Sequence, residues 1–171
     1  MNNLNKIKVF TVIIILFITS ACNIKYSFTG ASISPDTRTI QISHFPNRAT
    51  NVQPTLSNTL TEEMKDRFLN QTSLSLVNIG GDLALEGEIT DYKVAPMAYQ
   101  GNETAALNRL TISIRVRFTN TKDETKNFES NFSRYADFES SKNIATVEGQ
   151  LISEIVEQLT EDVFNKAVVN W

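Results

Sequence analysis

The sequence predicts an α+β fold, a two-layer sandwich in which two helices pack on one face of a mostly antiparallel sheet of four to five strands. Two segments repeat apolar residues every four positions, which is the period of an amphipathic helix. Several other segments alternate apolar and polar residues, which is the period of a strand with one buried face. Helices that are segregated from a mostly antiparallel sheet form two layers around one core.

Five segments are expected to form strands. They are residues 38–45, 74–77, 83–94, 110–118 and 127–138. The fourth is the clearest, because its apolar and polar side chains alternate without a break. Gly80, Gly81 and Asp82 suit the positive φ of a tight turn, so we expect a hairpin from the second strand into the third. A change of register around Asp91 predicts either a β-bulge in the third strand or a strand that runs past the covered part of the sheet. Residues 95–108 are expected to be a polar connection.

Two segments are expected to form helices, one after Pro54 and one at the end of the chain. The apolar stripe of the first consists of Leu56, Leu60, Met64 and Phe68, and that of the second of Val147, Leu151, Ile155, Leu159 and Val163. A proline suits the first turn of a helix, because the N–H that proline lacks would have no intrahelical partner there. The acidic residues on the other face of the last helix are expected to be a solvated surface and not a metal site.

The first 22 residues have the three parts of a secretory signal peptide. Lys6 and Lys8 precede a mostly apolar run over residues 9–18, small residues occupy 19–21, and Cys22 follows directly. A membrane-spanning helix needs about 20 apolar residues, so this run is too short for a permanent anchor. The chain has one cysteine, and its position is the informative feature of this segment.

This segment resembles a bacterial lipoprotein signal, in which the cysteine becomes the acylated first residue of the mature chain. The resemblance implies lipid attachment at Cys22 and divides the chain into a signal peptide (1–21), a lipidated tether (22–37) and a folded domain (38–171). Thr19 departs from the pattern, because Leu is commonest at the third position before the cysteine. An ordinary signal peptide followed by a free thiol, or an uncleaved anchor, stays open as an alternative.

The composition excludes several functional classes. A single cysteine cannot form an intramolecular disulfide, and a single histidine, His44, cannot form a multi-histidine metal centre. Without Lys6 and Lys8 the 16 basic residues fall to 14 against 19 acidic ones, which disfavours non-specific binding of nucleic acid. No nucleophile–base pair, phosphate-binding loop or metal motif is visible. We therefore expect a protein that is not an enzyme and that uses no cofactor or metal.

Basic side chains on the expected sheet form the one candidate binding site. The candidates are Lys93, Arg109, Arg115, Arg117 and Arg134. Arg115 and Arg117 lie on the polar face of the 110–118 strand, and guanidinium groups bind phosphate oxygens in a bidentate manner. The alternative is a solubilising strand face whose arginines are partly paired with Glu86, Glu88 or Glu129.

Several stretches of the mature sequence resemble the LptE family as it occurs in Bacteroidetes. They are residues 26–30 (YSFTG), 45–48 (FPNR), 54–56 (PTL), 101–112 (GNETAALNRLTI) and 164–171 (FNKAVVNW). The resemblance implies two helices on a small sheet and an outer-membrane lipoprotein that assists lipopolysaccharide assembly. It also implies an LptD-like β-barrel as the partner, in which the lipoprotein sits as a plug, and direct binding of lipopolysaccharide by basic residues.

The same resemblance indicates a periplasm-facing position at the outer membrane, held by an N-terminal acyl anchor. In Bacteroidetes-type lipoproteins an acidic cluster after the cysteine directs export to the cell surface, and the residues that follow Cys22 contain none. A function of a different class stays open, namely a lipid-anchored periplasmic binding or scaffold module of another outer-membrane transport machine.

Overall fold

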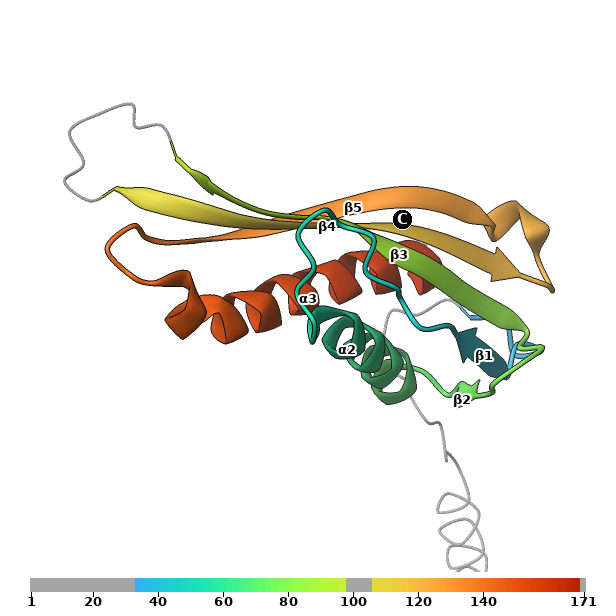
Figure 1. Ribbon diagram of the computed structural model, residues 1–171. Helices are drawn as coiled ribbons and strands as arrows, with labels where there is room; N and C mark the ends of the chain where they lie inside the picture. The colour runs from blue at the N-terminus through green and yellow to red at the C-terminus, as the bar shows by residue number, and fades with distance from the viewer. Residues whose placement is uncertain (1–32, 98–105, 170–171) are drawn as a thin grey trace, which may run out of the picture.

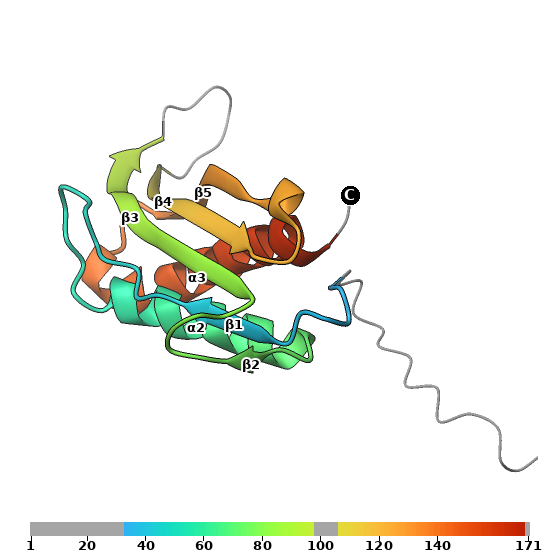
Figure 2. The ribbon, with the colours of Figure 1, turned by 90° about the vertical axis from the view of Figure 1, so that its right-hand side faces the viewer.

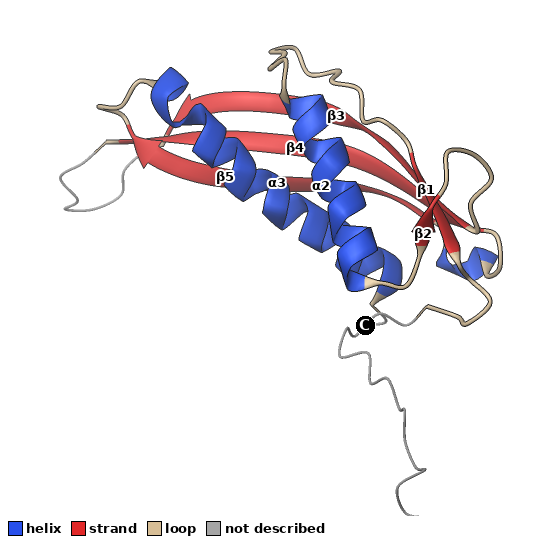
Figure 3. Ribbon diagram, turned by 90° about the horizontal axis from the view of Figure 1, so that it is seen from below, coloured by secondary structure: helices blue, strands red, loops and turns tan. Residues whose placement is uncertain are grey.

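The computed structural model describes residues 33–97 and 106–169 of the chain. The elements are β1 (Thr39–Ile42), α2 (Leu56–Gln71), β2 (Ser75–Leu76), β3 (Leu83–Pro96), β4 (Leu107–Asn120), the short 3₁₀ helix η1 (Glu124–Lys126), β5 (Phe128–Glu139) and α3 (Ile144–Val168). Both helices cover the same face of one sheet (Figures 1 and 3). The predicted α+β sandwich of two helices on one sheet is therefore confirmed. Cys22 and the expected signal peptide lie outside the described residues.

The five strands are arranged in the order β2-β1-β3-β4-β5. β3, β4 and β5 follow one another as an antiparallel meander, and β1 pairs in parallel with both β2 and β3. The sheet is thus mostly antiparallel, as expected. The predicted hairpin from β2 into β3 is wrong, because β1 lies between these two strands (Figure 2).

The two glycines before β3 lie where the chain passes from β2 to β3 across β1. Gly80 does have a positive φ, of 75°. Gly81, however, lies so close to β1 that an added Cβ would stand 2.7 Å from the backbone nitrogen of Gln41. The sequence signal for a hairpin turn was therefore in part a signal for close approach of two backbones.

β3 and β4 are longer than the sequence pattern indicates. Their pairing continues to Pro96 and begins at Leu107, so part of the segment expected to be a polar connection is strand. There Ala95 pairs with Arg109 and Pro96 with Asn108, so the strand pairing continues beyond the segment in which apolar and polar residues alternate. The predicted bulge is confirmed, because the register between β3 and β4 shifts between Ile89 and Asp91.

The core lies between the helices and the facing side of the sheet. The predicted helix stripes are largely buried, and so are the side chains of β4 that face the helices. In β4 these are Leu110, Ile112, Ile114, Val116 and Phe118. The two helices meet through Phe68 and Phe164, whose rings contact edge to face with centroids 5.2 Å apart.

Gly87 leaves room for an aromatic ring in this core. It lies on the helix-facing side of β3, paired with the buried Val116. An added Cβ would collide with the ring of Phe45 and with the backbone oxygen of Arg115. Phe45 is fully buried, so its ring occupies the space that a side chain at Gly87 would need.

Asp82 joins the turn before β3 to the start of β1. Its Oδ2 accepts hydrogen bonds from the backbone N–H of Arg38 at 2.9 Å and from both the N–H and the hydroxyl of Thr39. Its Oδ1 lies 3.2 Å from Nζ of Lys122. The N–H of Arg38 first, then the hydroxyl of Thr39 and Lys122, hold the pKa of Asp82 well below its ordinary value of 3.8.

We expect Gly87→Ala to lower the free energy of unfolding by about 1–3 kcal/mol, because the methyl group overpacks the site against Phe45 and the β4 backbone. Gly149→Ala is the matched control. Gly149 is exposed in α3 with nothing within 4 Å of an added Cβ, so this change should stabilise the protein by roughly 0.5–1 kcal/mol. Urea denaturation of both variants checks the pair, and equal effects would contradict this account of Gly87.

We expect the stability of the protein to fall as the pH drops below about 3.8, in part because Asp82 must be protonated. Its pKa is lowered in the folded state, so its contribution is present above the ordinary pKa and is lost on acidification. Asp82→Asn should therefore destabilise the protein at pH 7 and flatten the dependence of stability on pH below 4. Thermal unfolding between pH 3 and 7 measures both effects. Asp66→Asn, at an exposed position of α2, is the control for the loss of one carboxylate and should leave the stability at pH 7 close to that of the native protein.

Candidate functional site

The side of the sheet that faces away from α2 and α3, here called the open face, carries most of the candidate residues. Side chains alternate between the two sides of a strand, so the burial of the even-numbered residues of β4 places the odd-numbered ones on the open face. In β3 the bulge after Ile89 changes the phase, so that Glu86 and Glu88 before it and Lys93 beyond it all lie on the open face.

The structure brings four of the five candidates together and separates the fifth. Lys93, Arg109, Arg115 and Arg117 lie on the open face. Arg134 is paired across the strands with the buried Ile112 and therefore lies on the helix side. There it forms a two-pronged contact with Asp162 of α3, both N–O distances being 2.6 Å. Arg134 thus connects β5 to α3.

Arg109 is held by two neighbours on β5. Its Nε and Nη2 donate to the two carboxylate oxygens of Asp137 at 2.7 and 2.8 Å. The carbon of its guanidinium lies 3.4 Å from the centroid of the Tyr135 ring. The hydrogen bonds from Arg109 lower the pKa of Asp137, and those to Asp137 raise the pKa of Arg109. Both the edge and the flat face of this guanidinium are engaged within the protein.

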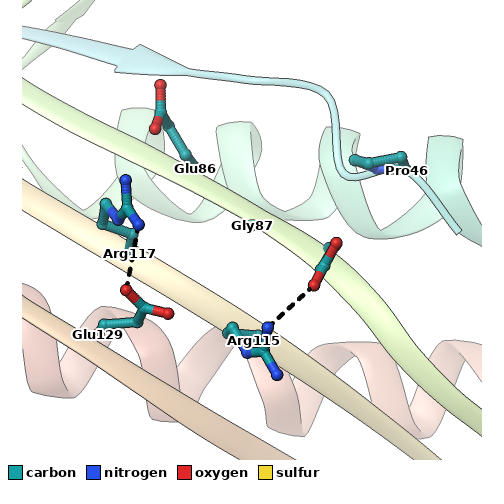
Figure 4. Close-up of a pocket in the computed structure, with 7 residues that line it drawn as sticks. Pro46, Glu86, Gly87, Arg115, Arg117 and Glu129 are labelled. Carbon is teal, nitrogen blue, oxygen red and sulfur yellow. Dashed lines mark hydrogen bonds and ion pairs between the residues drawn. The ribbon is translucent and has the colours of Figure 1, made fainter. Parts of the chain in front are cut away.

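Arg115 and Arg117 are held less firmly. Arg115 lies 3.3 Å from Glu88, and Arg117 lies 3.2 Å from Glu129, as the dashed lines of Figure 4 mark. Their side chains are 51% and 62% exposed, and each makes one charged contact. Exposed pairs of this kind contribute about 0–1 kcal/mol, so either guanidinium can exchange its partner for a ligand at small cost.

A shallow hollow lies between these two arginines on the open face. Its volume is about 240 Å³. It is lined by Pro46, Glu86, Gly87, Glu88, Arg115, Arg117 and Glu129. Glu86 stands opposite Arg117 in the strand register, yet it makes no ion pair with the residues that the structure describes. Two of the three pairings that the sequence suggests, those with Glu88 and Glu129, are thus present.

The open face carries more acid than base over the described strands. Its acidic residues are Glu86, Glu88, Asp91, Glu129, Asp137 and Glu139, and its basic residues are Lys93, Arg109, Arg115 and Arg117. The candidate site is therefore a mosaic of alternating charges. Such a mosaic suits a ligand or a protein surface that carries both phosphate or carboxylate groups and cationic groups.

The described residues contain no group of three His, Cys, Asp or Glu side chains that could hold a metal ion. Over the same residues, neither helix is both long and apolar enough to cross a membrane. His44 is exposed, and its Nδ1 lies 3.5 Å from the hydroxyl of Thr61 on α2.

Sequence reasoning missed a second hollow, of about 410 Å³, at the end of the sheet where the chain enters the fold. It is lined by Ile33, Ser34, Asp36, Leu83, Phe118, Asn120, Lys122, Asp123, Lys126, Ala167 and Val168. Four segments that are far apart in the sequence build it, and no periodic pattern joins them. The charged turn from Lys122 to Lys126 is the one part of it that a sequence pattern marks.

Solved structures of low sequence identity share this fold. A minor lipoprotein of Acinetobacter baumannii is 11% identical with a TM-score of 0.51, covering 76% of this chain and 91% of its own. A hypothetical protein of Chlamydia trachomatis is 11% identical with a TM-score of 0.53, covering 78% and 99%. A Xanthomonas campestris protein is 12% identical with a TM-score of 0.52, covering 81% and 90%. At this identity the likeness concerns the fold alone.

A comparison with curated protein sequences finds no match. The family model of LptE, described as lipopolysaccharide-assembly, matches residues 37–167. That match begins just before β1 and ends in the last turn of α3, so it includes both helices and every strand described above. The resemblance noted from the sequence is thereby confirmed, and the chain belongs to the LptE family.

Proposed function

We propose that the protein is a non-catalytic lipoprotein of the outer membrane that assists lipopolysaccharide assembly from the periplasmic side. The observation that carries this proposal is the family match over residues 37–167, which covers the whole described domain. The structure supports it with a two-layer domain whose open face is broad, polar and shallowly hollowed. Such a face suits contact with a large amphipathic molecule or with another protein.

Within this role, we propose Arg115 and Arg117 as the phosphate contacts, with Lys93 farther along the same face, opposite Thr111. Both arginines are more than half exposed and each is held by one contact longer than 3 Å. Lys93 is exposed and makes no ion pair within the described part of the chain. Arg109 and Arg134, which are clamped in bidentate contacts to Asp137 and Asp162, are better suited to holding the sheet than to binding a ligand.

We expect the double variant Arg115→Ala with Arg117→Ala to bind purified lipopolysaccharide at least about tenfold more weakly, because two guanidinium–phosphate contacts are lost. The control removes the same charge from α2 on the helix side, as Lys65→Ala with Arg67→Ala. Titration of fluorescent lipopolysaccharide measures the affinity, and circular dichroism verifies the fold. Equal binding by the double variant and the native protein would retire these residues as the site.

We further propose that the partner of this domain is an LptD-like β-barrel and that Cys22 carries the acyl anchor. The partner follows from family membership, and the anchor from the lipoprotein signal that precedes the domain. One acyl chain binds membranes only marginally, whereas two or three anchor a protein stably at about 0.8 kcal/mol per buried CH₂.

We expect the detergent-extracted protein, tagged after Trp171, to co-purify with a large β-barrel, and its intact mass to include acyl groups at Cys22. Cys22→Ser should yield a folded, unacylated chain. If the native protein brings down no barrel, the LptD partnership fails. If its mass lacks acyl groups, the anchor fails, whatever the barrel result.

The charges of the open face also fit a second function. The open face carries an excess of carboxylates, and its arginines are paired with some of them, which suits contact with a protein surface that carries charges of both signs. This observation supports a lipid-anchored scaffold module of another outer-membrane transport machine. Co-purification of a different membrane complex in place of a barrel would favour it.

A further inference from the structure

The hollow between Arg115 and Arg117 holds more carboxylates than guanidinium groups. Glu86, Glu88 and Glu129 line it together with the two arginines, so that these side chains leave one net negative charge. They come from three adjacent strands, β3, β4 and β5 (Figure 4). A ligand that enters the hollow therefore meets groups of both signs.

Arg117 stands between two carboxylates and contacts one of them. In the strand register Glu86 of β3 lies opposite Arg117 on one side, and Glu129 of β5 lies opposite it on the other. Directly opposed residues of an antiparallel pair have Cβ atoms about 4.5–5.5 Å apart, so both carboxylates lie near Arg117. Arg117 donates to Glu129 at 3.2 Å, whereas Glu86 forms neither an ion pair nor a side-chain hydrogen bond with any described residue. The carboxylate of Glu86 is thus available to bind a cation from outside.

A phosphate group bound by the arginines would release the other two carboxylates. Arg115 contacts Glu88 at 3.3 Å and Arg117 contacts Glu129 at 3.2 Å. Guanidinium groups bind phosphate oxygens in a bidentate manner, and such contacts can replace ion pairs that are weak at exposed positions. Three carboxylates would then surround the phosphate and repel it. A ligand that also brings a positive charge relieves this repulsion.

The lining of the hollow indicates which cation it can hold. A primary ammonium group has three N–H donors, which suit carboxylate oxygens. A quaternary ammonium group has none and is bound by aromatic rings instead, and no aromatic side chain is among the described residues that line the hollow. The three carboxylates do not form a group that could hold a metal ion. The hollow therefore favours a primary ammonium.

The size of the hollow suits a headgroup and not an acyl chain. Its volume of about 240 Å³ lies below the roughly 300–1,000 Å³ of pockets that enclose a drug-sized molecule. Pro46 is the one apolar side chain among the described residues of its lining. An acyl chain would gain little there, because it would find almost no apolar surface to cover. The ligand is therefore small and charged, or is the charged end of a larger molecule.

We propose that this hollow binds a zwitterionic phosphoethanolamine group. Arg115 and Arg117 bind its phosphate, and Glu86 binds its ammonium. Because Glu86 lies directly opposite Arg117, the two charges of the ligand need only a short link between them. The inference rests on the phosphate role proposed for the two arginines and adds to it the requirement for a cation. A phospholipid and a lipopolysaccharide can both carry this group.

The first test measures the affinity of the full mature protein, in a non-ionic detergent, for small soluble probes. We expect phosphoethanolamine to bind at least about tenfold more tightly than phosphocholine or inorganic phosphate, because it alone supplies both a phosphate and N–H donors. Chemical-shift titration at low ionic strength, followed at the side chains of Arg115 and Arg117, gives each dissociation constant.

The second test uses Glu86→Gln, which should move two affinities in opposite directions. The variant lacks the carboxylate that binds the ammonium, so phosphoethanolamine should bind at least about tenfold more weakly. It also has one negative charge fewer in the hollow, so inorganic phosphate should bind at least as tightly as it does to the native protein. Glu154→Gln removes the same charge from an exposed position of α3 and should change neither affinity. Circular dichroism verifies the fold of both variants.

Two further measurements identify the molecule that carries the group. Detergent micelles doped with phosphatidylethanolamine are compared with micelles doped with phosphatidylcholine, and lipopolysaccharide that bears phosphoethanolamine is compared with lipopolysaccharide that lacks it. A preference for the phosphatidylethanolamine micelles that Glu86→Gln abolishes assigns the site to a phospholipid. The same result in the second comparison assigns it to lipopolysaccharide.

Three results would overturn the proposal and leave the arginines as phosphate contacts. Equal binding of phosphoethanolamine and inorganic phosphate by the native protein refutes the ammonium contact. Equal binding of phosphoethanolamine and phosphocholine refutes recognition through N–H donors. An unchanged affinity of Glu86→Gln for phosphoethanolamine refutes Glu86 as the partner of the ammonium. If none of the phosphate probes binds, the phosphate role of Arg115 and Arg117 fails as well.

Discussion

The rest of this structure depends on one constraint, which is that the β3–β4 pair is buried on one side and not on the other. These two strands form the centre of the sheet, and every second side chain of β4 from Leu110 to Phe118 packs under the helices. A one-residue slip would turn the whole apolar set toward water, so the register is strongly specified. The positions of the open-face arginines follow from the same register, because they occupy the alternate places along β4.

Periodic features of the sequence were predicted well. The helix stripes from Leu56 and Val147, the alternation of β4 and the bulge near Asp91 each arise from local spacing, and the structure has all of them. The place of β1 could not be predicted, because its parallel partners come from segments more than 30 residues away. Local turn chemistry at Gly80 and Gly81 therefore indicated a hairpin where the chain crosses β1.

The face of the sheet that each candidate residue occupies could be predicted from the sequence, but its contacts could not. Arg134 shares the phase of Phe128 and Phe132, so its position on the helix side could have been inferred from the sequence. The partner of each arginine depends on the exact strand register and on rotamers, which no sequence pattern specifies. Asp137 consequently emerges as a partner only from the structure, and together with Glu129 it changes the open face from a basic patch into a mosaic of charges.

The length of β3 sets how far the Pro96 end of the sheet lies from the point where the chain enters the fold. The chain enters beside Leu83, where Ile33 and Ser34 line the second hollow, and β3 runs from there to Pro96. Thirteen residue steps at about 3.3 Å place the two ends of this strand roughly 43 Å apart. With the anchor proposed at Cys22, the 11 residues up to Ile33 add at most about 40 Å. The Pro96 end of β3 then lies at most roughly 80 Å from the membrane surface, a limit set by the lengths of the strand and the tether.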